Sequence, residues 1–257
     1  MDVQETSLAA TGAEDWFPFP RMGTGTGLSL VCLPFAGGGA SRFLPLGRRL
    51  APLIEVQPVQ FPGRESRIDD PPCPDAGRLV AELSSALAPG LDGPYALLGY
   101  SLGAAYAFEL ALSLRARGLP EPRALFVLAA VAPHTRSPER LSEASEEDLV
   151  ERILRAEGVP PEVLTDRELL AMALGTLRMD LGMWERFDHK AESRLECPIY
   201  VYAGSADMSV SSSQLAGWRQ RTTGRCRFRT FSGGHFFGFD NTSALAAAIG
   251  ADLAHSS

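Results

Sequence analysis

An apolar run at residues 95–100, YALLGY, passes directly into a segment with helical spacing that ends at Gly118. Units of this kind recur, because other segments that favour strands alternate with other segments of helical spacing. The runs that predict strands lie at 28–35, 54–60, 123–131, 197–205 and 225–232, and the segments that predict further helices lie at 75–89, 211–224 and 241–254. This alternation predicts an α/β fold with a mostly parallel sheet and helices on both faces.

The segment at about 137–194 interrupts the alternation, because it contains no strand signal and favours several helices in succession. Ligands of such folds bind at the carboxyl edge of the sheet, so an insertion at that edge borders the binding crevice. We therefore expect a helical lid rather than helices that only enlarge the core. No linker divides the chain, which predicts one domain over residues 1–257. The first two dozen residues are polar and rich in Gly and Thr, and are expected to form a loosely held lead-in.

Composition limits the partners and cofactors of the chain. A formal net charge of -7 argues against a nucleic-acid partner, since phosphate backbones attract basic surfaces. Four cysteines without CxxC spacing predict neither a disulfide framework nor a zinc site, and we expect no metal and no other cofactor. No stretch approaches the ~18 apolar residues of a membrane span, and the first residues lack the apolar core of a signal peptide. The expectation is a cytoplasmic protein without a membrane partner.

The residues Gly99 to Gly103, GYSLG, match the pattern G-x-S-x-G between a predicted strand and a predicted helix, the context that this motif requires. Ser101 then occupies a strained turn that projects its hydroxyl from the sheet edge, and the flanking glycines leave room for the strand and helix to cross. The helix N-terminus behind it favours developing negative charge. The motif predicts a serine nucleophile in an α/β-hydrolase fold.

A serine nucleophile needs a base within hydrogen-bond reach. His235 lies in the Gly-rich segment SGGHFFGF directly after the last predicted strand, where this fold presents its base. His134 follows an earlier strand, but it precedes any downstream acid, which is inconsistent with the expected chain order Ser, Asp, His. His189 lies within the helical insertion beside charged residues, and His255 lies in the tail. His235 is therefore the predicted base.

The acid that orients the base should follow an earlier strand end, in the order Ser, Asp, His. Asp207 does so, just beyond the predicted strand at 197–205, although an Asp in this place can also be a solvated loop residue or a helix cap. Asp240 follows His235 too closely to orient it. An oxyanion hole needs two backbone donors, and we expect them to be the N–H of Leu102 and a donor from the segment PFAGGGAS, with Ala36 preferred and Phe35 next. That glycine run lacks both G-x-G-x-x-G spacing and the Walker lysine, which argues against nucleotide binding.

Several segments together resemble the type II thioesterases, the stand-alone editing enzymes of polyketide and non-ribosomal peptide synthases. They are LPFAGGGAS, VQFPGRESR (59–67), GYSLGAAYAFELA, LRMDLGMWERF (177–187), CPIYVYAGSADMSVS and FSGGHFF, and the resemblance covers about residues 28–240. It implies that Ser101, Asp207 and His235 form a triad that hydrolyses acyl groups from the phosphopantetheine arm of an acyl or peptidyl carrier protein, for editing or release. It also implies an acyl pocket under the lid helices.

We expect Phe35, Tyr100 and Phe236 to bind substrate, and the protein to be a monomer. Tyr100 and Leu102 stand where the resembled family usually has histidine and methionine, and Met208 stands where proline or an acid is common. These departures leave the triad intact and affect substrate preference.

Carrier proteins are acidic, so docking on this chain would require a local basic patch, for which the candidates are Arg64, Arg67, Arg178, Arg186 and Lys190. Two alternatives stay open. One is a general carboxylesterase or acyltransferase with the same triad, and the other is a non-catalytic subunit that binds carrier proteins.

Overall fold

The computed structural model describes residues 12–23, 27–51, 53–136, 139–156, 161–188 and 192–255. Within them, six parallel strands form one sheet in the order β2-β1-β3-β4-β5-β6. The strands are β1 (Ser29–Leu33), β2 (Glu55–Pro58), β3 (Tyr95–Tyr100), β4 (Leu125–Leu128), β5 (Ile199–Gly204) and β6 (Cys226–Phe231). Each lies within one of the predicted runs, so the predicted α/β fold with a parallel sheet is confirmed.

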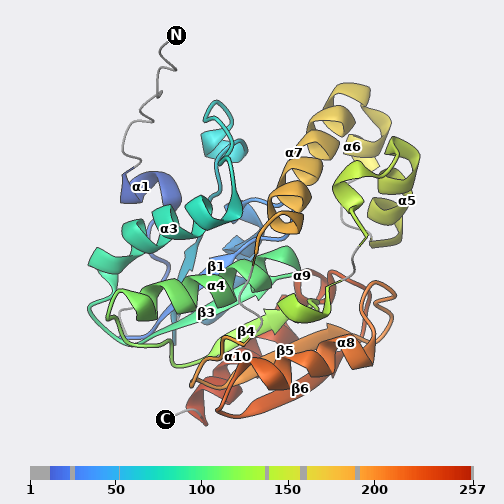
Figure 1. Ribbon diagram of the computed structural model, residues 1–257. Coiled ribbons are helices and arrows are strands. Elements are labelled where there is room, and N and C mark those ends of the chain that lie inside the picture. The colour runs from blue at the N-terminus through green and yellow to red at the C-terminus, as the bar shows by residue number, and fades with distance from the viewer. Residues whose placement is uncertain are drawn as a thin grey trace.

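Helices cover both faces of this sheet (Figure 1). Along a strand, successive side chains point to opposite faces. Val31 and Leu97 accordingly pack with α3 (Ala76–Leu87) and α4 (Leu102–Ala116) in one buried cluster. Side chains one position away pack in a second cluster with α2 (Leu44–Leu50) and α10 (Thr242–Ala254). The sheet is therefore buried on both sides, which is why its central strands are almost wholly apolar.

The remaining helices are short or belong to the segment between β4 and β5. They are α1 (Ala13–Trp16), α5 (Glu146–Ala156), α6 (Pro161–Thr165), α7 (Arg167–Glu185), α8 (Ser212–Ala216) and α9 (Phe237–Asp240). Figure 1 shows α5, α6 and α7 together at one end of the molecule. The predicted helix at 211–224 is shorter than expected, because α8 is followed by a 3-10 helix at Gly217–Arg221. Membrane-spanning helices are absent from the part of the chain that the structure describes.

The prediction of a loosely held lead-in is wrong for the described residues of that segment. Trp16 is fully buried in the core cluster that contains α3 and α4. Its carbonyl accepts the Gln60 N–H at 2.9 Å, and the Arg67 guanidinium lies 4.8 Å from the centre of its ring. Met22 pairs with Val56 in an antiparallel bridge beside β2. Burying the large ring of Trp16 away from water is favourable, so this side chain anchors the segment to the core.

Replacing Trp16 with alanine is expected to lower the free energy of unfolding by about 3–5 kcal/mol, the usual cost of truncating a buried aromatic ring. The midpoint of urea unfolding measures this change. Met208→Ala is the matched control, because Met208 is 94% exposed and should change stability by less than about 0.5 kcal/mol. Equal effects of the two substitutions would contradict the place of Trp16 in the core.

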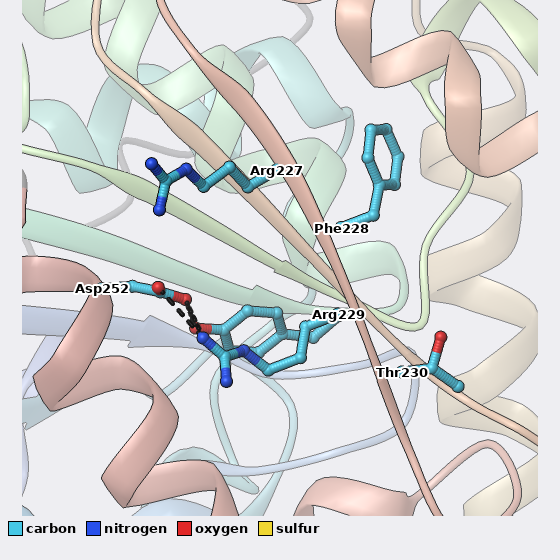
Figure 2. Close-up of a pocket in the computed structure, with 6 residues that line it drawn as sticks. Arg227, Phe228, Arg229, Thr230 and Asp252 are labelled. Carbon is cyan, nitrogen blue, oxygen red and sulfur yellow. Dashed lines mark hydrogen bonds and ion pairs between the residues drawn. The ribbon is translucent and has the colours of Figure 1, made fainter.

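Strand β6 is an edge of the sheet, and four of its six residues are exposed. Figure 2 shows a hollow along it, lined in part by Arg227, Arg229 and Asp252. Arg229 donates to Asp252 at 3.1 Å, and the Tyr202 hydroxyl donates to the same carboxylate at 2.5 Å. Charged side chains of this kind discourage pairing with a further strand. The hollow contains none of the predicted site residues.

Glu109, on α4, is a partly buried carboxyl group near Arg221. Burial raises its pKa to about 7, although the positive charge of Arg221 acts in the opposite direction. In an unfolded chain the pKa of a glutamate is about 4.3. Between these two values the folded state holds more protons than the unfolded state, so the free energy of unfolding falls as the pH rises.

Glu109→Gln is therefore expected to raise the free energy of unfolding by about 1–3 kcal/mol at pH 8 and to change it little near pH 4.5. Urea unfolding at the two pH values measures the difference. Glu168→Gln, which alters an exposed carboxylate on α7, is the control that is measured at the same two pH values. A stabilisation by Glu109→Gln that is equal at both pH values would show that the raised pKa is not its cause.

Candidate active site

The candidate site lies where the chain order of the sheet reverses. The chain passes from β1 to its neighbour β2 and then returns to β3, on the other side of β1. Parallel sheets open a ligand crevice at such a point, outside the carboxyl ends of the strands. Here Leu33, at the end of β1, is in register with Gly99, near the end of β3. The loop after β1 and Ser101 after β3 therefore meet at this edge.

Ser101 occupies the turn between β3 and α4 with φ 51° and ψ -120°, a strained conformation for a residue with a side chain. Its N–H donates to the Leu128 carbonyl of β4 at 2.7 Å, which holds the turn in place. A Cβ atom at Gly99 would lie 2.2 Å from the Ala104 Cα, and one at Gly103 would lie 2.3 Å from the Leu33 carbonyl oxygen. The strand and helix approach so closely that glycine is required on both sides of the serine.

Two backbone donors flank this turn. Leu102 is the first residue of α4, where N–H groups lack partners within the helix. Ala36 follows β1, in a turn closed by the Gly38 N–H, which donates to the Phe35 carbonyl at 2.8 Å. Within the described residues, neither the Leu102 N–H nor the Ala36 N–H donates to a protein acceptor. Both amide groups are thus free to bind an oxygen of a substrate.

The structure brings Asp207 and His235 together from the loops after β5 and β6. His235 Nδ1 and Asp207 Oδ2 lie 2.9 Å apart, and their side chains are 11% and 1% exposed. Burial raises the pKa of the Asp207 carboxyl, but hydrogen bonds from His235 and Ser209 and the charge of His235 outweigh it, so the pKa lies below its ordinary value. An ionised carboxylate only accepts hydrogen bonds, so Nδ1 carries the hydrogen and a neutral ring leaves Nε2 unprotonated.

Ser209 is a site residue that sequence reasoning missed. Its hydroxyl donates to Asp207 Oδ1 at 2.6 Å and lies 2.9 Å from His235 Nδ1. Its N–H donates to the same Asp207 oxygen at 2.9 Å. The signal for it is the spacing Asp-x-Ser, because an aspartate in a turn accepts from the residue two positions later. Ser209 thereby holds the carboxylate that faces the imidazole.

The three residues predicted to bind substrate pack against one another. The rings of Phe35 and Phe236 are 4.7 Å apart, and the rings of Tyr100 and Phe236 are stacked at 5.6 Å. Tyr100 is fully buried behind the site, where its hydroxyl donates to the His235 carbonyl at 2.7 Å and accepts the Gly238 N–H at 3.3 Å. Among the described residues, no hydrogen bond joins the Ser101 hydroxyl to the His235 ring. Tyr100, which precedes Ser101, is the direct connection between the two segments.

Two of the arginines proposed for a docking patch are wrong for that role. Arg64 and Arg67 are buried, and each forms an ion pair with an aspartate. Arg178 is partly buried and donates to two backbone carbonyls at 2.9 and 2.6 Å, whereas Arg186 is exposed. Lys190 lies outside the described residues. Sequence alone places an arginine on the surface by default, since unpaired burial of its charge is rare.

The other histidines take different places. His134 lies in a short 3-10 helix at Pro133–Thr135, beside Gly217, and burial together with the charge of Arg221 lowers its pKa. His255 is exposed at the end of α10. His189 lies outside the described residues.

Comparison with known proteins agrees with the family resemblance found in the sequence. A family model for the thioesterase domain matches residues 29–253. The probable cadicidin biosynthesis thioesterase of Streptomyces griseus is 38% identical over 208 residues, which are 81% of this chain and 57% of that protein. Thioesterase PikA5 of Streptomyces venezuelae is 36% identical over 210 residues, 81% of this chain and 74% of that protein. The structure of BorB, the type II thioesterase from the borrelidin biosynthetic cluster, is similar with a TM-score of 0.83, at 34% identity over 95% of this chain and 99% of that one.

Proposed function

This chain belongs to the thioesterase family, and on that premise we propose that it hydrolyses acyl groups from the phosphopantetheine arm of an acyl or peptidyl carrier protein. The names of its relatives, which refer to biosynthetic clusters, support this substrate class. The observation that carries the proposal is the arrangement at one edge of the sheet. A strained serine turn with two free N–H groups and a buried pair of histidine and carboxylate both follow carboxyl ends of strands in this sheet, and Tyr100 connects them through its hydrogen bond to the His235 carbonyl.

In the proposed reaction the Ser101 oxygen attacks the thioester carbonyl carbon while His235 Nε2 accepts the hydroxyl proton. Asp207 keeps the imidazole in the required tautomer and stabilises the imidazolium that forms. The N–H groups of Leu102 and Ala36 stabilise the oxyanion. The carbon–sulfur bond then breaks, the pantetheine thiol takes the proton from His235, and water hydrolyses the acyl-enzyme in the same way.

The acyl chain is proposed to lie against Phe35 and Phe236, with α7 and its neighbouring helices as the lid. Phe35 is partly exposed and rests on Phe236, and α7 lies next to the loop that contains Phe35, since Leu177 faces Gly37. Tyr100 supports this aromatic surface from behind. The carrier protein as partner is part of this proposal, and so is the single domain with its lid. The cytoplasmic location and the monomeric state stay predictions.

An assay on purified protein tests the proposal. We expect kcat/KM for acyl groups on carrier proteins or pantetheine to exceed that for matched oxygen esters by at least roughly tenfold. A preference for the oxygen esters would instead indicate a carboxylesterase, and transfer of the acyl group to an added alcohol would indicate an acyltransferase. Unchanged pathway output in a strain that carries Ser101→Ala would indicate a non-catalytic binding subunit.

A further inference from the structure

A buried ion pair joins helix α7 to the segment that follows β2. Arg64 Nη1 and Nη2 each donate to one oxygen of Asp180 at 2.6 Å, in a bidentate arrangement. Arg64 is 6% exposed and Asp180 is 1% exposed. Removing two charges from water is unfavourable unless they pair closely, so this contact constrains both segments. It connects the motif PGRE with α7, 116 positions further along the chain.

The same ion pair holds the loop after β1. The Gly37 N–H donates to Asp180 Oδ2 at 2.7 Å, and Arg64 Nη1 donates to the Gly38 carbonyl at 3.3 Å. Gly37 has φ 77°, and a Cβ atom there would lie 3.8 Å from the Leu177 Cβ of α7. Helix α7 therefore lies directly over the loop, and its carboxylate restrains the peptide group between Ala36 and Gly37.

The neighbouring peptide group carries the Ala36 N–H. Its carbonyl, that of Phe35, accepts the Gly38 N–H at 2.8 Å, so the peptide group with the Ala36 N–H is restrained within the loop and the next group is restrained by Asp180. Further along the loop, the N–H groups of Ala40 and Ser41 donate to side chains of the segment after β2 at 3.0 and 3.1 Å. Among the described residues, the hydrogen bond from outside the loop that lies nearest to Ala36 in the chain is thus the one from the Gly37 N–H to the carboxylate on α7.

We propose that Asp180 is a positioning residue, which holds the Ala36–Gly37 peptide group so that the Ala36 N–H points at the oxyanion. The inference rests on the proposed function, because it requires Ala36 to be an oxyanion donor. Asp180 acts through Gly37 and touches no reacting atom. Since Asp180 belongs to α7, the oxyanion hole is complete only while this helix is seated on the loop.

Loss of such a positioning residue should affect kcat more than KM. The negative charge on the carbonyl oxygen develops in the transition state, so a misdirected N–H weakens binding of the transition state rather than of the substrate. A displacement of about 1 Å at such a donor can cost about 10²-fold in rate. Loss of Asp180 should therefore lower kcat and leave KM nearly unchanged.

Asp180→Asn and Asp180→Ala test the role, with Glu185→Gln as a matched control. Glu185 lies on the same helix and anchors it through Ser142, whose N–H it accepts at 3.0 Å, instead of through the loop after β1. We expect the Asp180 variants to lower kcat for an acyl-pantetheine thioester by about 10²-fold with KM within about threefold, and Glu185→Gln to keep kcat within about threefold. The kinetic constants are measured at a temperature at which circular dichroism shows that every variant is folded.

An inhibitor that mimics the tetrahedral intermediate distinguishes a positioning role of Asp180 from a role in packing alone. Binding of an acyl trifluoromethyl ketone, which forms an oxyanion on Ser101, should weaken by about 10²-fold in Asp180→Ala, whereas binding of the matched amide analogue should change by less than about threefold. The double variant Arg64→Met with Asp180→Leu replaces the buried pair by apolar side chains of similar size. It should unfold near the wild-type temperature and still have the low kcat.

Wild-type kcat in the single variants or in the double variant would overturn the inference, and so would equal weakening of the ketone and the amide. Those outcomes, together with loss of turnover in Ser101→Ala, leave the proposed function intact. Turnover that persists in Ser101→Ala would overturn the proposed function itself.

Discussion

Replacing Ser101 with alanine is expected to lower kcat for acyl-pantetheine thioesters by about 10⁴–10⁶-fold, the loss found when a serine hydrolase is deprived of its nucleophile. In the proposed mechanism the hydroxyl oxygen of Ser101 forms the acyl-enzyme, and an alanine at this position has no nucleophilic atom. The backbone of that turn is held by the bond from the Ser101 N–H to Leu128, which alanine keeps. The thermal unfolding midpoint should therefore stay near that of the wild type.

Ser113→Ala on the same helix is the matched control for this experiment, since Ser113 lies near the far end of α4. It should retain full activity. Hydrolysis by Ser101→Ala at more than about one hundredth of the wild-type rate would contradict a covalent mechanism at this residue.

Asp207→Asn is expected to lower kcat by about 10⁴-fold while the protein stays folded. An amide at this position can donate a hydrogen bond to Nδ1, which favours the imidazole tautomer with its hydrogen on Nε2, facing the nucleophile. Ser209→Ala removes the hydrogen bond to the other carboxylate oxygen but leaves its charge. It should lower kcat by about tenfold, the value of one hydrogen bond.

Steady-state kinetics of the two variants measures this difference. Equal losses in Asp207→Asn and Ser209→Ala would indicate that the serine, rather than the carboxylate, sets the state of the imidazole. An unchanged kcat in Asp207→Asn would contradict the assignment of Asp207 as the orienting acid.

The central strands of the sheet could be predicted from sequence because they are buried on both faces and are almost wholly apolar, as in β3, β4 and β5. Helix α2 could not, since its sequence LPLGRRL is short and contains proline and glycine. The length of the helix predicted at 211–224 is too great, because a polar cap predicts where a helix begins better than where it ends. Sequence reasoning does not predict the burial of Trp16, because the segment before it is polar and a single aromatic residue gives no periodic pattern.

At the candidate site, sequence predicts the residues that follow strand ends, because parallel strands bring their carboxyl ends to one edge. Asp207 and His235 lie in contact for this reason. The contact between Arg64 and Asp180 had no such signal, because a pairing across 116 positions leaves no local pattern. Sequence reasoning therefore places Arg64 on the surface, whereas the structure buries it against Asp180, the carboxylate that holds the loop after β1.

The most direct test of the account is to find the acyl group on the protein during turnover. The protein is mixed with an acyl-pantetheine thioester, quenched in acid, digested with trypsin and mapped by mass spectrometry. We predict one acyl mass on the tryptic peptide of residues 79–115, located at Ser101 by fragmentation and absent in Ser101→Ala. An acyl group on a cysteine or on another serine, with turnover intact in Ser101→Ala, would contradict the account.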